Sequence, residues 1–179
     1  YPRSPANAMG RGLAMLTNDR KENGLVSGMN VTENTTLAVL SRFSPGGWLN
    51  NKAERIAAES RRAELGIRAT SLEQKAESLS GGNQQKLVFA KWLETGPRVL
   101  LLDEPTRGVD VGAKHDIYKL MAKWKEAGMS ILLITSELPE LLALSDRILV
   151  FHYGKLVREF AGGNVTPESV MSTAMGTGK

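Results

Sequence analysis

Residues 99–102 form an uninterrupted apolar run, and two adjacent acids, Asp103 and Glu104, follow it directly. Such a run is typical of a parallel strand that is covered on both faces. Residues 113–127 then place apolar side chains at helical spacing, and residues 130–135 form a second apolar run. This alternation of strand and helix predicts an α/β fold with a parallel sheet at its core.

The rest of the chain adds one strand and a helical region. Residues 12–17 are a short apolar run between polar or glycine neighbours, which predicts a further buried strand. Residues 32–43 and 52–65 are expected to form helices joined by a turn at residues 44–47. We therefore predict a helical subdomain over residues 31–78.

The C-terminal part has the pattern of a hairpin. Residues 147–152 and 155–160 are apolar-rich runs on either side of a two-residue turn, which predicts two antiparallel strands. A turn at Gly162-Gly163 and a weak helix over residues 166–175 are expected to follow.

Composition limits the chemistry that the chain can perform. It contains no cysteine, which excludes disulfides and thiolate metal sites. The net charge of +4 suits anionic partners such as nucleotides, although a solvated basic surface would give the same balance. Since no apolar run approaches the roughly 18 residues of a membrane-spanning helix, any membrane role is predicted to be peripheral.

The two acids after residues 99–102 are expected at the carboxyl edge of the sheet, where open α/β sheets bind ligands. Asp103 could hold Mg²⁺, directly or through water, and Glu104 could orient or deprotonate an attacking water. The alternative is that both acids merely end the strand in solvent.

The segment Leu-Ser-Gly-Gly-Asn-Gln-Gln-Lys at residues 79–86 precedes an apolar-periodic helix. Ser80 is expected to cap this helix, and Gly81 and Gly82 leave the N–H groups of its first turn open to phosphate. Glycine also allows close approach of a phosphate to the backbone. An ordinary capped helix would explain Ser80 but not the paired glycines.

Taken together, residues 79–86 resemble the ABC signature motif, and residues 101–106 resemble Walker B with its catalytic glutamate. Residues 107–110 fall where the family has its D-loop. The fuller forms of these motifs resemble the second nucleotide-binding domain of the duplicated ATPase subunit in bacterial sugar importers of the ribose, galactose and xylose type. The resemblance runs over residues 5–160.

This resemblance implies an incomplete P-loop NTPase (ABC ATPase) domain over residues 1–179. Its parts are a helical subdomain over residues 31–78, a signature, Walker B, D-loop and switch region over residues 79–160 that ends in the hairpin, and a C-terminal tail over residues 161–179. The implied site has catalytic Glu104 and Ser136, the metal ligand Asp103, and the nucleotide-binding residues Ser80, Gly81, Gly82, Gln84, Asn18 and Asp110.

Three features depart from the family's pattern. Asn18 stands where the family generally has a glutamine and the sugar importers an acid, and Ser136 stands at the place of the switch histidine. No G-x-x-x-x-G-K-[ST] occurs, so the phosphate-binding loop is absent and the chain is expected to be a fragment that is inactive alone. These departures predict asymmetric hydrolysis, in which the signature serves the competent site of the partner domain.

By resemblance, the parent subunit uses ATP and Mg²⁺ on the cytoplasmic face of the membrane. Its implied partners are the N-terminal nucleotide-binding domain of the same subunit, membrane permease subunits and, indirectly, a sugar-binding protein, with no nucleic acid. Two alternatives remain open: an ABC-type ATPase outside transport, acting on nucleic acid or in translation, and a non-catalytic interaction module.

Overall fold

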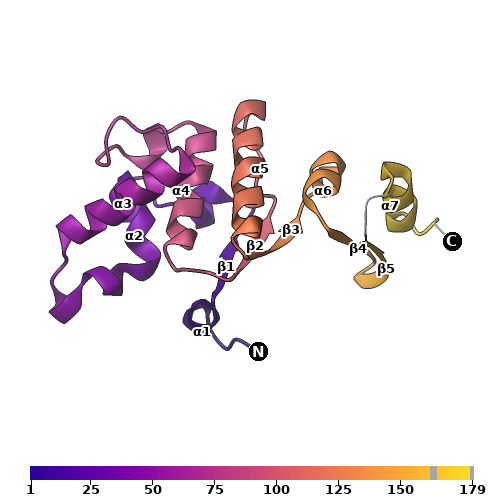
Figure 1. Cartoon of the computed structure of the whole chain (residues 1–179), viewed down its shortest axis with the longest axis horizontal. Coiled ribbons are helices and arrows are strands. Elements are labelled where there is room, and N and C mark those ends of the chain that lie inside the picture. The colour runs from indigo at the N-terminus through magenta and orange to yellow at the C-terminus, as the bar shows by residue number, and fades with distance from the viewer. Residues whose placement is uncertain (162–164, 178–179) are drawn as a thin grey trace. The chain divides into compact units, whose positions relative to one another are not determined.

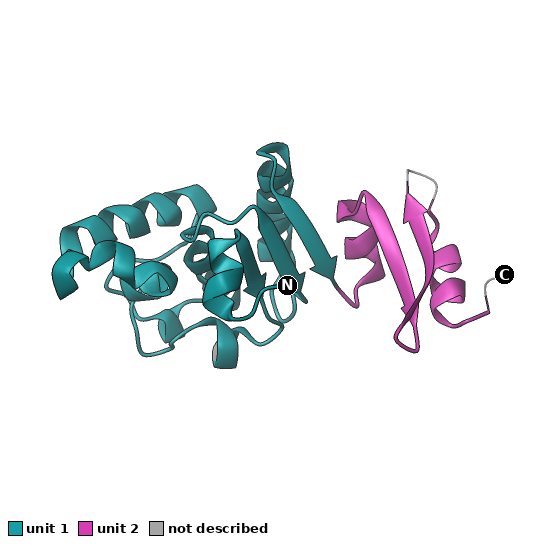
Figure 2. Cartoon of the chain, turned by 90° about the horizontal axis from the view of Figure 1, so that it is seen from below, with its two compact units in different colours: residues 1–134 teal, residues 135–179 magenta. Residues whose placement is uncertain are grey.

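The structure is a computed structural model that describes residues 1–161 and 165–177. The turn expected at Gly162-Gly163 lies outside the described residues. The chain divides into two compact units, residues 1–134 and 135–179, which Figure 2 shows in different colours.

The first unit is built on a three-stranded parallel sheet in the order β1-β2-β3 (Figure 1). The strands are β1 (Leu13–Leu16), β2 (Val99–Asp103) and β3 (Ser130–Ile134). Leu16 pairs in register with Leu102, and Asp103 with Ile134, so the carboxyl ends of the strands meet at one edge. The predicted α/β class with a parallel sheet is confirmed.

Only one face of this sheet is covered by the described residues. Leu16, Leu100 and Leu102 are at most 1% exposed, whereas Met15 and Leu132 on the opposite face are 48% and 50% exposed. On β2 itself, Val99 and Leu101 on the second face are half-buried, so the expected coverage of both faces is complete on only one of them. An apolar run marks side chains that are suited to burial, but it does not specify which element covers them.

The helical region lies over residues 31–93 and differs from the expected pattern at one place. Helix α2 (Val31–Thr36) continues as a 3₁₀ segment, Leu37–Phe43, instead of the single expected helix. Val39 has non-helical backbone angles there, which fits the stiffness of β-branched side chains in a helix. Helix α3 (Asn51–Leu65) ends at Gly66 in the left-handed conformation, and α4 is Gly81–Leu93.

Two further helices complete the first unit. Helix α1 (Pro5–Gly10) precedes β1, and α5 (Val111–Glu126) connects β2 to β3. The rings of Phe89 in α4 and Trp124 in α5 lie 5.1 Å apart, which joins these helices above the buried face of the sheet. No helix among the described residues is long and apolar enough to cross a membrane.

The second unit contains the predicted hairpin. It consists of α6 (Leu138–Leu144), the antiparallel strands β4 (Arg147–His152) and β5 (Lys155–Ala161), and α7 (Pro167–Ala174). Tyr153 and Gly154 have positive φ at the turn, as a tight two-residue hairpin turn requires. Ile148, Val150 and Val170 form its small buried core.

Candidate functional site

The two acids lie where the sequence predicted them, at the carboxyl end of β2. Asp103 is the last residue of the strand, and both acids are half-buried. Glu104 turns the chain away from the sheet with φ at 49°, and its N–H donates to the carbonyl of Ile134 at 2.8 Å. A glutamate in the left-handed region is strained, and such positions are concentrated at functional sites.

The signature segment begins α4, with Ser80 at the N-cap position. The expected cap was wrong in one respect: the Ser80 side chain makes no capping hydrogen bond to the helix backbone. Its hydroxyl oxygen instead accepts from Nδ2 of Asn83 at 2.8 Å, and Oδ1 of Asn83 accepts from the N–H of Arg68. The asparagine side chain, one turn into the helix, therefore holds the hydroxyl that would otherwise reach the backbone.

The paired glycines are required by packing within this chain. A Cβ on Gly82 would lie closer than 3.0 Å to Cβ of Ala113 in α5, and Gly82 is buried. A Cβ on Gly81 would lie 2.9 Å from Nη2 of Arg20 and 3.3 Å from the carbonyl oxygen of Gly108. Close contact between α4 and the segment after Glu104 thus explains both glycines, in addition to the phosphate approach inferred from sequence.

Arg20 links the two motifs and was missed by the sequence reasoning. Its guanidinium donates to the carbonyl oxygens of Arg107 at 2.9 Å and Gly108 at 3.2 Å. A longer contact of 3.5 Å joins Nε of Arg20 to Oε1 of Gln84 in α4. The partners are 64 to 88 residues away along the chain, so no local pattern could have identified this arginine.

The segment that carries Arg20 follows one face of α4. Residues Arg20–Gly24 form a single π-helical turn. At its end the carbonyl of Gly24 accepts from Nζ of Lys91, and a Cβ on Gly24 would lie 3.0 Å from Val88. Residues 84, 88 and 91 share one helical face, so the segment is held along about two turns of α4. Burial lowers the pKa of Lys91.

The remaining predicted residues fall into separate places. Asn18 is exposed and follows β1 at the same sheet edge at which Asp103 ends β2. Asp110 lies instead beside the signature, where its Oδ1 accepts from the N–H of Ala113 and caps α5.

Gln84 is 9% exposed and its amide donates to the carbonyl of Ala76. Ser136 belongs to the second unit, next to Thr135, whose hydroxyl contacts the carboxylate of Glu140.

The acid pair can serve as part of a metal site but not as a complete one. No group of three or more His, Asp or Glu side chains that could hold a metal ion occurs in the described part of the chain. Mg²⁺ commonly takes one or two protein carboxylates and fills its remaining positions with water and phosphate oxygens. Asp103 at the sheet edge, with Glu104 beside it, fits that kind of site.

Comparison with known proteins agrees with the motifs. The family model described as ABC transporter matches residues 4–107. The chain is 46% identical over 174 residues to the ribose import ATP-binding protein RbsA of Bacillus licheniformis, covering 97% of this chain and 35% of that protein. It is 48% identical over 173 residues to the xylose import ATP-binding protein XylG of Thermoanaerobacter pseudethanolicus, and the match covers 97% of this chain and 34% of that protein. The chain spans about a third of the length of the curated relatives that it matches.

Solved structures show the same fold. The ATP-binding cassette MJ1267 of an ABC transporter superposes with a TM-score of 0.79 at 22% identity, covering 98% of this chain and 71% of that one. The cassette MJ0796, in a dimeric post-hydrolysis state bound to ADP and Pi, superposes with a TM-score of 0.71 at 21% identity. The match covers 87% of this chain and 66% of that one. With a family match over more than half its length and motifs held in the contacts described above, the chain belongs to the ABC transporter family.

Proposed function

We propose that the chain is part of the ATP-hydrolysing subunit that energises sugar import through an ABC transporter. The observation that carries this proposal is the direct packing of the signature glycines, Gly81 and Gly82, against the segment that follows Asp103 and Glu104. This contact couples a phosphate-binding helix start to the acids that would act on a nucleotide. The names of the relatives, which are ribose and xylose import proteins, support sugar as the cargo.

The residues have distinct roles in this proposal. A Mg²⁺ ion held by Asp103 would neutralise charge on the phosphates. Glu104 orients the attacking water or accepts its proton, and Asn18 contributes a polar group at the same edge. Ser80, Gly81 and Gly82 face the nucleotide of a partner domain. Gln84 and Asp110 are proposed to contribute to nucleotide binding, and their contacts also hold the signature in position. Ser136 is proposed to complete the switch region.

The proposed organisation is that of a partial ABC nucleotide-binding domain, with a helical subdomain over residues 31–78 and a C-terminal tail after residue 160. The exposed apolar face of the sheet, with Met15, Leu132 and Ile134, supports a domain that needs a further layer. For want of a phosphate-binding loop in its sequence, the chain is proposed to be inactive alone. Its proposed partners are the N-terminal nucleotide-binding domain of the same subunit and the permease, at the cytoplasmic face of the membrane.

The test is calorimetric titration of Mg-ATP into the chain, alone and mixed with the N-terminal nucleotide-binding domain of the same importer subunit. We expect no binding by the chain alone, and binding with phosphate release in the mixture. Tight binding by the chain alone would contradict the proposed division of the site.

Variants in the mixture test the assigned roles. Ser80→Ala removes a hydroxyl whose contact in the chain is to Asn83, and it should greatly reduce phosphate release. Glu104→Gln should reduce it less, because Asn18 stands where the family generally has a glutamine, which is proposed to make this site the weaker one. Ser60→Ala, at an exposed position of α3, is the matched control and should change nothing. A stronger effect of Glu104→Gln than of Ser80→Ala would count against asymmetric hydrolysis.

A further inference from the structure

A groove of about 630 Å³ lies in the first unit, and Lys86, the last residue of the signature segment, is the only part of the motifs described above that lines it. It runs between the end of α3, the turn that follows Gly66, and helices α4 and α5, which Figure 1 shows as neighbours. Its floor is apolar, because Leu65, Ile67 and Leu120 are all buried there. The volume is within the range of roughly 300 to 1,000 Å³ that is typical of small-molecule sites.

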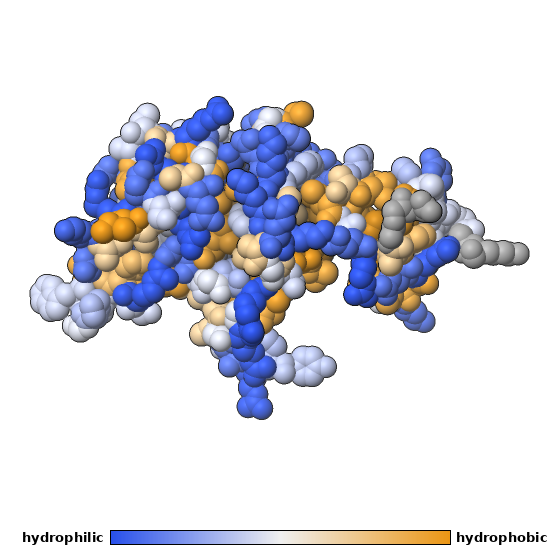
Figure 3. Space-filling model, viewed as in Figure 1, coloured by the Kyte–Doolittle hydropathy of each residue, from blue (hydrophilic) through white to orange (hydrophobic). Residues whose placement is uncertain are grey.

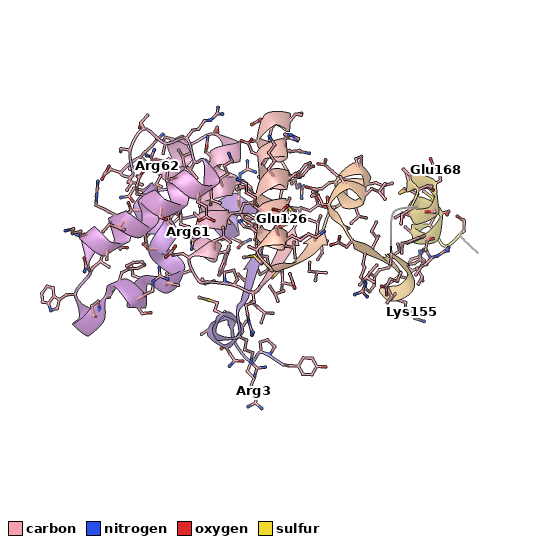
Figure 4. All side chains as sticks on the ribbon, in the orientation of Figure 1. Arg3, Arg61, Arg62, Glu126, Lys155 and Glu168 are labelled. Atoms are coloured by element: carbon pink, nitrogen blue, oxygen red, sulfur yellow. The ribbon has the colours of Figure 1, made fainter. Side chains whose placement is uncertain are left out.

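Positive charge is concentrated along this groove. Two carboxylates line it, Glu64 and Asp116, and the cationic side chains that line it are Arg62, Arg68, Lys86, Lys119 and Lys123. The chain as a whole has 23 Lys and Arg against 19 Asp and Glu, so the excess charge in the groove is comparable with that of the entire chain. Arg62 extends from α3, as labelled in Figure 4, and hydrophilic residues cover the visible side of α5 in Figure 3.

Part of this charge is balanced within the protein. Glu64 pairs with Arg61 at 2.7 Å, and Arg62 pairs with Glu59 at 2.7 Å. Asp116 pairs at 2.8 Å with Lys86, whose side chain is buried. The hydrogen bond from Lys86, with the nearby charges of Lys119 and Arg68, holds the pKa of Asp116 below its usual value, so this carboxylate stays ionised at neutral pH.

The remaining cations of the groove differ from Arg62 and Lys86 in their ion pairing. Among residues 1–161 and 165–177, no carboxylate lies within ion-pair distance of Arg68, Lys119 or Lys123. Lys86 donates to Asp116 and to the carbonyl of Gly66, which together accept two of its three hydrogens. The groove therefore has donors on both walls, from the turn on one side and from α5 on the other.

We propose that this groove binds a small phosphorylated anion with at least two negatively charged groups. Arg68 binds one group, and Lys119 and Lys123, one helical turn apart on α5, bind the other. A concave site with an apolar floor suits a small molecule better than a membrane surface, which would require an exposed flat face.

The first experiment titrates tripolyphosphate into the full chain by calorimetry, with Lys119→Ala/Lys123→Ala as the test variant. Both lysines are exposed on α5, and alanine is favourable in helices, so the variant should fold. We expect it to weaken binding by about tenfold or more, since hydrogen bonds to charged groups are strong. The matched control is Lys114→Ala/Lys125→Ala, which removes the same charge from the same helix outside the groove and should weaken binding less than about twofold.

The location of the bound anion is measured by amide chemical shifts in the same chain. Tripolyphosphate should shift the amides of residues 66–68 and 119–123. Shifts confined to residues 81–84 would mean that the anion binds at the start of α4. Equal weakening by the two double variants would mean nonspecific attraction. Either result would overturn the proposal.

Vesicles of phosphatidylglycerol form a third arm of the experiment. Vesicle binding that depends on Lys119 and Lys123, without tripolyphosphate binding, would also overturn the proposal. Because the assay needs no nucleotide hydrolysis, its outcome is independent of the proposed transport function.

Discussion

The signature and the acid pair are held in place by different means, although they are neighbours through the segment between Glu104 and Asp110. The start of α4 depends on contacts from distant parts of the chain: Arg20 on one side and Ala113 on another. The acids are held by the backbone, through pairing of β2 with β3, a hydrogen bond from the N–H of Glu104 to Ile134, and one left-handed residue. Side-chain substitutions remote from the signature should therefore disturb it, while the acids, held by backbone bonds, should respond mainly to changes at their own positions.

The largest effect is expected from Gly82→Ala. Its new Cβ would collide with Cβ of Ala113, and overpacking of this kind costs about 1 to 3 kcal/mol in the free energy of unfolding. Urea denaturation measures the loss. Gly28→Ala is the control, because a Cβ at that position would have no atom within 4 Å. If Gly82→Ala is as stable as Gly28→Ala, the close packing of α4 on α5 is incorrect; Ala113→Gly should restore part of the loss.

Arg20→Met should have the next largest effect. It removes the donors to the carbonyls of Arg107 and Gly108, which should cost about 1 to 2 kcal/mol because the guanidinium is only partly buried. Hydrogen exchange should then accelerate at residues 82–84 and 108–109 more than elsewhere. Arg3→Met, at an exposed terminal position, is the control. Uniform acceleration across the chain would refute a specific link between the motifs.

At the acid pair, the comparison is between Glu104→Gly and Glu104→Ala. Both remove the carboxylate, but only glycine adopts the φ of 49° without strain. The glycine variant should be more stable than the alanine variant by about 1 kcal/mol in urea denaturation. Equal stabilities would show that residue 104 is not held in the left-handed region, and the acids would then not be fixed by local geometry.

The smallest effect concerns Lys91, which anchors Gly24 to α4. Its pKa is lowered by burial, so the unfolded chain binds more protons than the folded chain as pH rises from the lowered value toward 10.5. This residue should therefore make the wild type gain stability with rising pH in that window, relative to Lys91→Met. Urea midpoints of both proteins across alkaline pH measure the difference. A wild type that loses stability relative to the variant would mean that the ammonium is stabilised by its contact with Gly24.

Residue patterns along the chain were sufficient to predict most of the element types and the motifs. Uninterrupted apolar runs predicted β2 and β3, the paired glycines marked the start of α4, and the glycine at position 66 marked the end of α3. These features are encoded by residues close together in the chain, because hydrophobic periodicity and backbone preferences act over a few positions. Residue patterns alone were therefore sufficient to identify the family.

The residues that hold the motifs together became evident from the folded chain and not from its sequence. Arg20 gave no local signal, the glycine at position 82 proved to be required by Ala113, and the hydroxyl of Ser80 turned to Asn83 instead of the helix backbone. The structure also decided that one face of the sheet is covered and the other exposed. These contacts and this exposure have one cause. Packing and hydrogen bonds join atoms that are near in space but distant in sequence, so local residue patterns do not encode such contacts.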